Sequence, residues 1–430
     1  MRRFTGASLT YFLALTALVG CGSLPTNPAA TPALPATVSP AAVVTPTVTP
    51  LPTLTPTPTS MPTPTPGPGL DELLQTPVAL YTVAELDGAA TAYAALAELY
   101  PNRAEPWLGQ AAVAQRRDDD DAALAYLQRA VEAQPSNFEA WQQLAVMYEQ
   151  RAQYADAAEA YGKLIDLTPD DPNLYVARAM AEARLDQADA AIADLRAARA
   201  LDPYREYAWL NVAGAAYGGR SYDTAIAVAS AGLEAYPGSA SLRIQSGLAR
   251  LAKGEAGAAL ADFEAAAAAD PNSFTALRWK GEALAALGRD EEAIGVLQQA
   301  GALGTSAGAG GLSTGFEAMT RAAQIMARSD PQAAFEYLAD QVIRFGQPPP
   351  LLFGYALVEL ERGNPGAALN RLTNLIDLYG YLPAYYWRAR IYADEGSTSL
   401  AIADLQAFLA VRRAGPDAEA AWALLEELGG

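Results

Sequence analysis

The sequence predicts an all-α protein built as a solenoid of helical hairpins, and three observations predict it. Pro recurs in steps of 34 residues at six positions and Ala at seven. Apolar residues make up 51% of the composition, which excludes a wholly disordered chain. Within one period the apolar residues recur at helical spacing in two separate runs. Two residue types locked to one period are typical of a repeat array rather than of a globular domain.

The residues in phase define the extent of the array. The Pro residues are Pro101, Pro135, Pro169, Pro203, Pro237 and Pro271. The Ala residues are Ala89, Ala123, Ala157, Ala191, Ala225, Ala259 and Ala293. Each Pro is expected just past the end of a helix, because Pro cannot continue one.

The period 138–171 shows why this spacing makes a helical hairpin. Two runs, separated by a break near Ala152, each place large apolar residues on one helical face. These residues are Trp141, Leu144, Tyr148, Tyr161 and Leu164. Ala145 and Ala157 are expected where the two helix axes come closest, since antiparallel packing needs small residues there.

This period resembles the tetratricopeptide repeat, a helix–turn–helix unit of 34 residues. Five residues match the family pattern, namely Trp141, Ala145, Tyr148, Ala157 and Pro169. The units 104–137, 240–273 and 274–307 match fewer positions. The resemblance covers nearly all of residues 70–430. It implies a right-handed α-solenoid of about ten such hairpins, closed by a C-terminal capping helix.

The phase divides this array into two blocks. Residues 70–307 form the first, although Pro77 weakens the helix that would open it. The phase then breaks, and the Gly-rich segment 308–314 is predicted to be an inserted loop. Residues 315–415 form the second block, where Ala334, Ala368 and Ala401 mark the units. Residues 416–430 are predicted to form the capping helix.

The first 69 residues have the composition of an export signal and a tether. Residues 1–20 combine Arg2 and Arg3 with a short apolar stretch, which is typical of a signal peptide. The segment from Leu18 to Cys21 resembles the lipobox of bacterial lipoproteins, which implies that Cys21 is lipidated and becomes the first mature residue. Residues 21–69 are rich in Thr, Pro and Ala and predict an extended, disordered tether.

Composition excludes several classes of function. The chain has no His and one Cys, so a His/Cys zinc site, an internal disulfide and a Ser–His or Cys–His nucleophile pair are impossible. A formal charge of −19 argues against nucleic acid as a partner. The acidic run 118–121 is expected to cap a helix rather than bind calcium. We therefore expect no metal, no cofactor and no enzymatic activity.

By resemblance to the family, the first helices of successive hairpins line a concave surface that binds peptides or helices of a partner protein. The residues at the corresponding positions are Val176, Met180, Leu210, Asn211, Tyr217, Ile244, Leu248, Arg278, Trp279 and Glu282. We expect Tyr217, Arg278 and Trp279 to be exposed anchors. The aliphatic members have a second interpretation, which is packing against the next hairpin. The Lys and Asn that hold a C-terminal carboxylate in some relatives are replaced here by Gln142 and Val146.

The sequence thus favours a lipid-anchored cell-envelope scaffold or adaptor that binds an unidentified protein or peptide. It would lie on the outer face of the plasma membrane of a single-membrane cell, or in the outer membrane of a two-membrane cell. An envelope lipoprotein that binds a small molecule or a glycan is an alternative, although an open solenoid suits it poorly. A hydrolase using carboxylates and a purely structural envelope element are less favoured functions.

Overall fold

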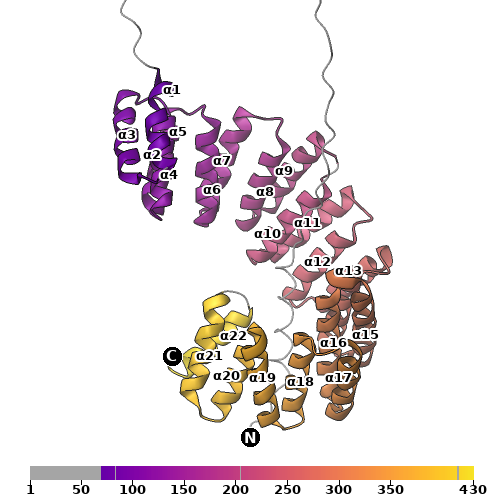
Figure 1. Cartoon of the computed structure of the whole chain (residues 1–430). Coiled ribbons are helices and arrows are strands. Elements are labelled where there is room, and N and C mark those ends of the chain that lie inside the picture. The colour runs from indigo at the N-terminus through magenta and orange to yellow at the C-terminus, as the bar shows by residue number, and fades with distance from the viewer. Residues whose placement is uncertain (1–68, 83, 204, 414–415) are drawn as a thin grey trace, which may run out of the picture.

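A computed structural model describes residues 69–82, 84–203, 205–413 and 416–430 of this chain (Figure 1). Cys21, the predicted signal peptide and the predicted tether lie outside the described residues. The described residues form helices and connecting turns, without a strand. The predicted all-α class is therefore confirmed.

The helices pair into ten consecutive hairpins. The first helices are α2 (Gln75–Thr82), α4 (Glu105–Arg116), α6 (Phe138–Gln150), α8 (Pro172–Arg184), α10 (Glu206–Gly218), α12 (Ala240–Ala252), α14 (Phe274–Ala286), α16 (Leu312–Ala327), α18 (Pro349–Glu361) and α20 (Leu382–Asp394). The second helices are α3 (Leu86–Leu99), α5 (Asp120–Ala133), α7 (Tyr154–Leu167), α9 (Ala188–Leu201), α11 (Tyr222–Ala235), α13 (Ala256–Ala269), α15 (Asp290–Ser306), α17 (Pro331–Phe345), α19 (Pro365–Tyr379) and α21 (Thr398–Val411). The short helix α1 (Leu70–Leu73) precedes them and α22 (Pro416–Glu427) follows them.

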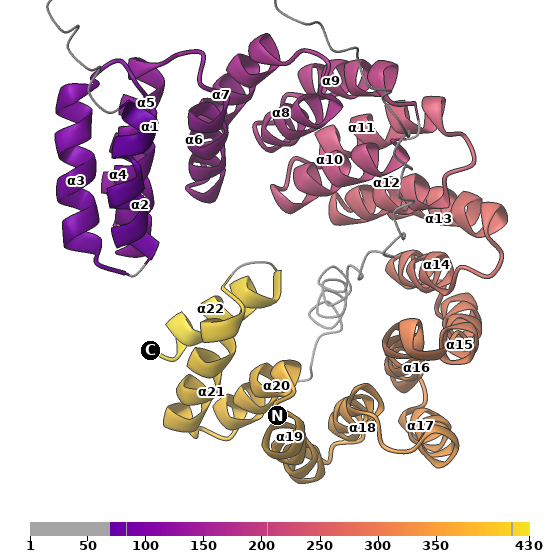
Figure 2. The same cartoon turned by 45° about the horizontal axis from the view of Figure 1, so that its top comes forward.

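The hairpins stack into a curved superhelix that turns back on itself (Figure 1). Figure 2 shows the first helices α14, α16, α18 and α20 on the inner side of the curve, with the second helices α15, α17, α19 and α21 outside. Each hairpin contacts chiefly its neighbours, so the apolar core runs along the array as a series of adjoining clusters. The predicted solenoid is confirmed.

Small residues bring the two helices of a hairpin together as the sequence predicts. Ala145 and Ala157 are both fully buried. A Cβ on Gly247 would lie 2.6 Å from the Phe263 ring, and a Cβ on Gly281 would lie 2.5 Å from Leu297. The first helix therefore carries the small residue and the second helix fills the space with a large one.

The turn within each hairpin depends on one residue of left-handed backbone. Such a residue follows nine of the ten first helices, and α16 is the exception among the described residues. These residues are Ala84, Asp118, Ala152, Asp186, Arg220, Gly254, Gly288, Gly363 and Gly396. Non-glycine residues rarely adopt this conformation because the Cβ crowds the backbone. The turns of the first five hairpins are therefore strained relative to those with Gly.

We expect Ala152→Gly to stabilise the protein by about 0.5–1 kcal/mol, because Gly adopts positive φ without that steric penalty. Ala152 is exposed, so no packing is lost. Ala193 provides the matched control, since it is exposed inside α9, where Gly lowers stability by about 1 kcal/mol. Urea unfolding of both variants gives the measurement. Equal destabilisation by the two substitutions would contradict the strain.

The predicted loop at 308–314 is only partly correct, because the connection in the structure is shorter. Helix α15 runs to Ser306, a single 3₁₀ turn covers Gly308–Gly310, and α16 already begins at Leu312. Of the glycines in this segment, Gly311 packs closely, because an added Cβ would collide with the carbonyl oxygen of Gly304, whereas Gly308 and Gly310 face open space. Glycines on either side of the segment allow close helix packing. A Cβ on Gly304 would lie 2.8 Å from the Cα of Gly315, so the backbones of α15 and α16 approach directly. The extra residues are absorbed mainly by longer helices, which makes α15 and α16 exceptions to the 34-residue unit.

Candidate protein-binding surface

The ten residues predicted to line the concave surface lie on four consecutive first helices. These helices are α8, α10, α12 and α14, which form the middle of the array. The repeat phase therefore places the predicted residues on neighbouring elements, as a shared surface requires. Their exposure separates them into two groups.

The first group remains accessible. Asn211 is exposed, and Met180, Leu210, Tyr217 and Ile244 are partly buried. The four apolar and aromatic members pack their bases against the core clusters beneath them. Tyr217 stacks obliquely on Tyr222 at a centroid distance of 5.6 Å, and burial raises the pKa of its hydroxyl. The accessible side chains of this group are mainly apolar, and Asn211 adds an exposed amide.

The second group is buried, which corrects part of the prediction. Arg278 is 1% exposed and Trp279 is 3% exposed, so neither is the exposed anchor that we expected. Glu282, Val176 and Leu248 are buried as well. Trp279 stacks near the ring of Phe263, with centroids 6.4 Å apart. For the two aliphatic residues, the packing interpretation is the correct one.

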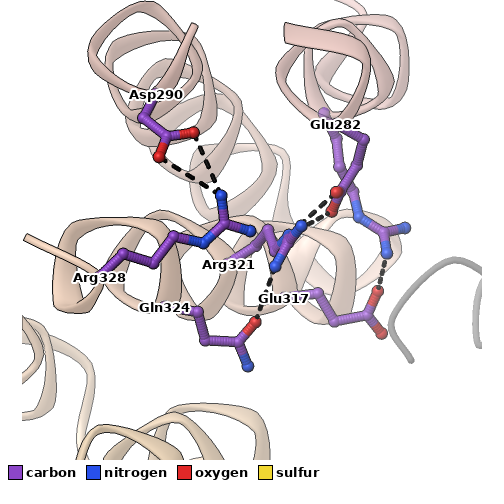
Figure 3. A network of polar contacts seen from close by, with 7 residues as sticks. Glu282, Asp290, Glu317, Arg321, Gln324 and Arg328 are labelled. Carbon is purple, nitrogen blue, oxygen red and sulfur yellow. Dashed lines mark hydrogen bonds and ion pairs between the residues drawn. The ribbon is translucent and has the colours of Figure 1, made fainter. Parts of the chain in front are cut away.

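The charged members of this group belong to a network that joins α14 to α16 (Figure 3). Arg321 Nε donates to Glu282 Oε2 at 2.9 Å, and its Nη1 donates to Gln324 at 3.4 Å. Arg278 Nη2 lies 3.3 Å from Glu317 Oε2. Each of these two ion pairs links one helix to the other, so their role is to hold adjacent hairpins in register.

A further pair flanks the network nearer to solvent. Arg328, just past the end of α16, donates to both carboxylate oxygens of Asp290 at 3.2 and 3.3 Å (Figure 3). Both side chains are partly exposed, whereas those of Arg321 and Glu282 are 1% and 7% exposed. Exposed pairs contribute little to stability, while breaking a buried pair leaves a charge without its partner. The buried pair of Arg321 and Glu282 is therefore expected to affect the stability of the fold more than the pair of Arg328 and Asp290.

Sequence reasoning missed this network because its two halves lie on either side of the break in phase. Arg321 and Glu317 follow the Gly-rich segment, where the 34-residue alignment no longer assigns a position. The opposite charges of Glu282 and Arg321 were the only indication of this network in the sequence. Pairing the two residues requires knowing where α15 ends and α16 begins, which the sequence did not reveal.

The described residues show neither a metal site nor a membrane-spanning helix. No group of three or more acidic, His or Cys side chains among them could hold a metal ion. No helix in that part of the chain is long and apolar enough to cross a bilayer. The accessible residues on α8, α10 and α12 can make apolar contacts and hydrogen bonds with another molecule.

Comparison with protein families identifies the repeat. Models described as tetratricopeptide repeat match residues 104–147, 138–171, 244–307 and 355–419. The chain therefore contains tetratricopeptide repeats, in both of the predicted blocks. This fold is typical of protein-interaction scaffolds, and proteins built from it are generally not catalysts. No curated protein matches the chain.

Comparison with solved structures finds chains that are similar to this one at low sequence identity. Yeast Tom70 shares 12% identity over 83% of this chain and 95% of its own, with a TM-score of 0.40. The Cut9 complex with Hcn1 gives 13% identity over 83% and 89%, with a TM-score of 0.38. YrrB, described as a tetratricopeptide-repeat protein with an unusual peptide-binding site, gives 22% identity over 45% and 99%, with a TM-score of 0.31.

Proposed function

We propose that this protein is a lipid-anchored scaffold of the cell envelope that binds a partner protein through the inner side of its superhelix. The observation that carries the proposal is the accessible, mainly apolar surface on α8, α10 and α12. Its members are contributed by consecutive first helices, so a partner segment lying across them contacts several hairpins at once. Extended or helical apolar segments bind such surfaces through side chains spaced along their length.

The anchor in this proposal is Cys21. It is the only Cys of the chain and directly follows a short apolar stretch with Arg2 and Arg3 before it. Two acyl chains on one residue provide stable membrane attachment, whereas one chain is marginal. Lipidation at this position, followed by a Pro-rich tether, would hold the array outside the membrane.

The partner site is tested with the full chain purified from solubilised membranes. We expect the triple variant Met180→Ser, Leu210→Ser, Ile244→Ser to lose a protein that the wild type retains in a pull-down. The matched control is Leu99→Ser, Leu167→Ser, Leu201→Ser, which removes exposed Leu side chains from second helices. The control should retain the protein. Equal retention by all three chains would contradict the assigned surface.

The anchor is tested separately. We expect Cys21→Ser to abolish incorporation of labelled fatty acid and to release the protein from the membrane fraction, or to leave an unprocessed precursor. A Cys21→Ser chain that takes up label and stays in the membrane like wild type would exclude lipidation at this residue. Partner binding by the array does not depend on this result, so the pull-down tests the binding surface and the Cys21→Ser variant tests the anchor separately.

A further inference from the structure

Three hairpins of the array are joined to the preceding hairpin by an ion pair of fixed spacing. The cation directly follows the first helix of its hairpin. The acid is the second residue of the second helix in the preceding hairpin, 30 positions earlier. The pairs are Arg117–Asp87, Arg151–Asp121 and Lys253–Asp223, at 2.5–2.6 Å. Each of them therefore connects neighbours in the stack.

The hairpin of α10 and α11 departs from this pattern. The residue after α10 is Gly219, although an acid, Asp189, is the second residue of α9. The cation stands one residue later, at Arg220, which has φ +65°. After α12 the order is the reverse, because Gly254 takes the left-handed position and Lys253 precedes it. Strained backbone persists where other contacts impose it, so Arg220 is expected to have a role outside its own turn.

Arg220 pairs with a helix far along the chain. Its Nη2 donates to Glu419 Oε1 on α22, 199 positions away. Figure 2 shows the helices from α10 to α22 following one curve around the inner side of the superhelix. The ion pair joins the two ends of that curve, so it connects parts of the array that are not neighbours in the stack.

This contact lies beside the candidate protein-binding surface. Tyr217, an accessible member of that surface, is on the last turn of α10, three residues before Arg220. Leu210 and Asn211 lie further back on the same helix. Helix α22 is therefore held against the end of α10 that carries Tyr217, at the border of the surface that a partner would approach.

The pair is suited to opening and closing. The side chains of Arg220 and Glu419 are 56% and 59% exposed. Removing an exposed pair changes an equilibrium by about two- to fivefold, because water solvates the separated charges well. A partner that binds only the open superhelix can offset a difference of that size.

We propose that Arg220 and Glu419 form a latch that holds the superhelix closed and restricts the access of large molecules to the accessible residues on α8, α10 and α12. The latch regulates the proposed partner surface, and in that sense the inference rests on the proposed function. Opening of the latch lowers the apparent affinity of a partner by the fraction of closed chains, so closure discriminates against weak binders.

Carbodiimide coupling of the full chain in membranes tests the contact. The reagent joins a Lys amine to a carboxylate that touches it, with loss of one water, and leaves Arg unchanged. The chain has only three Lys, so Arg220→Lys adds a defined amine with little background. We expect mass spectrometry of the monomer to find an amide between this amine and Glu419. Lys253 should couple to Asp223 or Glu255 as an internal positive control, and adding Glu419→Gln should remove the new amide.

An exchange of two neighbouring residues opens the latch without changing composition or charge. The variant Gly219→Arg, Arg220→Gly places the cation 30 positions after Asp189 and Gly in the left-handed position. A Cβ at residue 219 would come no closer than 3.4 Å to its neighbours, so the side chain fits. We expect this variant to keep its helical circular dichroism, because the exchange restores the local pattern of the other hairpins.

Access to the inner side is measured by the rate at which a polymer-linked maleimide modifies Asn211→Cys. We expect the exchange at 219 and 220 to raise this rate about two- to fivefold, and N-ethylmaleimide, a small reagent, to react equally with both chains. Ser230→Cys, exposed on α11, is the matched control and should react alike in both. Cys21 is present in every chain, so the parent chain gives the background.

The charge-reversed variant Arg220→Glu, Glu419→Arg should restore the slow rate. Absence of the amide to Glu419 while Lys253 couples, or its formation only between two chains, would exclude the latch. An unchanged polymer rate at Asn211→Cys would show that the latch does not restrict access. Neither measurement needs a partner, so a failure here is distinguishable from a failure of the pull-down.

Discussion

Replacing Arg321 with Ala is expected to destabilise the middle of the array by about 3–5 kcal/mol. The substitution leaves the carboxylate of Glu282 with 7% of its side chain exposed and without the guanidinium that lies 2.9 Å away. Water cannot replace that partner in so enclosed a position. Hydrogen exchange of the α14 and α16 amides measures the effect, because an array of this length need not unfold in one step.

Two further variants give this prediction its controls. Arg328→Ala removes the partly exposed pair with Asp290 and should change stability by less than about 1 kcal/mol. The double variant Arg321→Met, Glu282→Leu removes both charges and should recover much of the loss, since a buried apolar pair has no unpaired charge. A loss as small as that of Arg328→Ala would show that the inner pair does not hold α14 to α16.

The contact between α14 and α16 lies where the two blocks of the array meet, so breaking its ion pair should change how the array unfolds. Each hairpin is stabilised mainly by its neighbours, and α14, α15 and α16 join the block before residue 307 to the block after it. With the ion pair broken, the two blocks should melt in separate thermal transitions. A single unchanged transition in Arg321→Ala would contradict this expectation.

The repeat was predictable from the sequence because it depends on sterics at fixed spacing. Ala145, Ala157 and Pro169 have the roles that their spacing indicates: the two alanines are buried and the Pro follows the end of α7. The left-handed turn at Ala152 was located only as a break, since Ala has no preference for that conformation. Tertiary packing, rather than local propensity, imposes positive φ there.

The candidate surface was only partly predictable, for a reason visible at Arg278. Repeat phase gives the helix on which a residue lies, and it placed Leu210 and Ile244 correctly on α10 and α12. It does not give the distance to the following hairpin. Arg278 is buried against Glu317 of the following hairpin, and Trp279 packs on Phe263 of the preceding one, contacts that the phase of a single unit does not reveal.

Glu182 should make the stability of the array depend on pH near neutrality. Arg178 is already committed to Asp194 through two hydrogen bonds of 2.7 Å, and its Nε lies 3.9 Å from Glu182. One guanidinium thus faces two carboxylates between α8 and α9. Burial, and then the Asp194 charge, raise the pKa of Glu182 from 4.5 to about 7, although Arg178 opposes the shift. Its Oε2 has no hydrogen-bond partner among the described residues.

The sign of the effect follows from proton binding. Between pH 4.5 and about 7 the folded protein holds a proton on Glu182 that the unfolded chain releases, so stability falls as pH rises through this window. Above pH 7 the ionised side chain destabilises the fold by up to about 3 kcal/mol, at 1.36 kcal/mol per pKa unit. Glu182→Gln removes the titration and keeps the shape, so it should melt higher than wild type at pH 8.

Comparison of the two chains across pH isolates Glu182 from other buried acids. Asp417, whose pKa burial raises to about 6, titrates in both chains and cancels in the difference. The melting temperatures should therefore differ little at pH 5 and diverge steadily between pH 5 and 8. Glu159→Gln, at an exposed position on α7, controls for the loss of one negative charge from a chain of net charge −19 and should follow wild type. A pH-independent gain in Glu182→Gln would instead indicate a packing effect, because only a group that changes its ionisation can make the difference depend on pH.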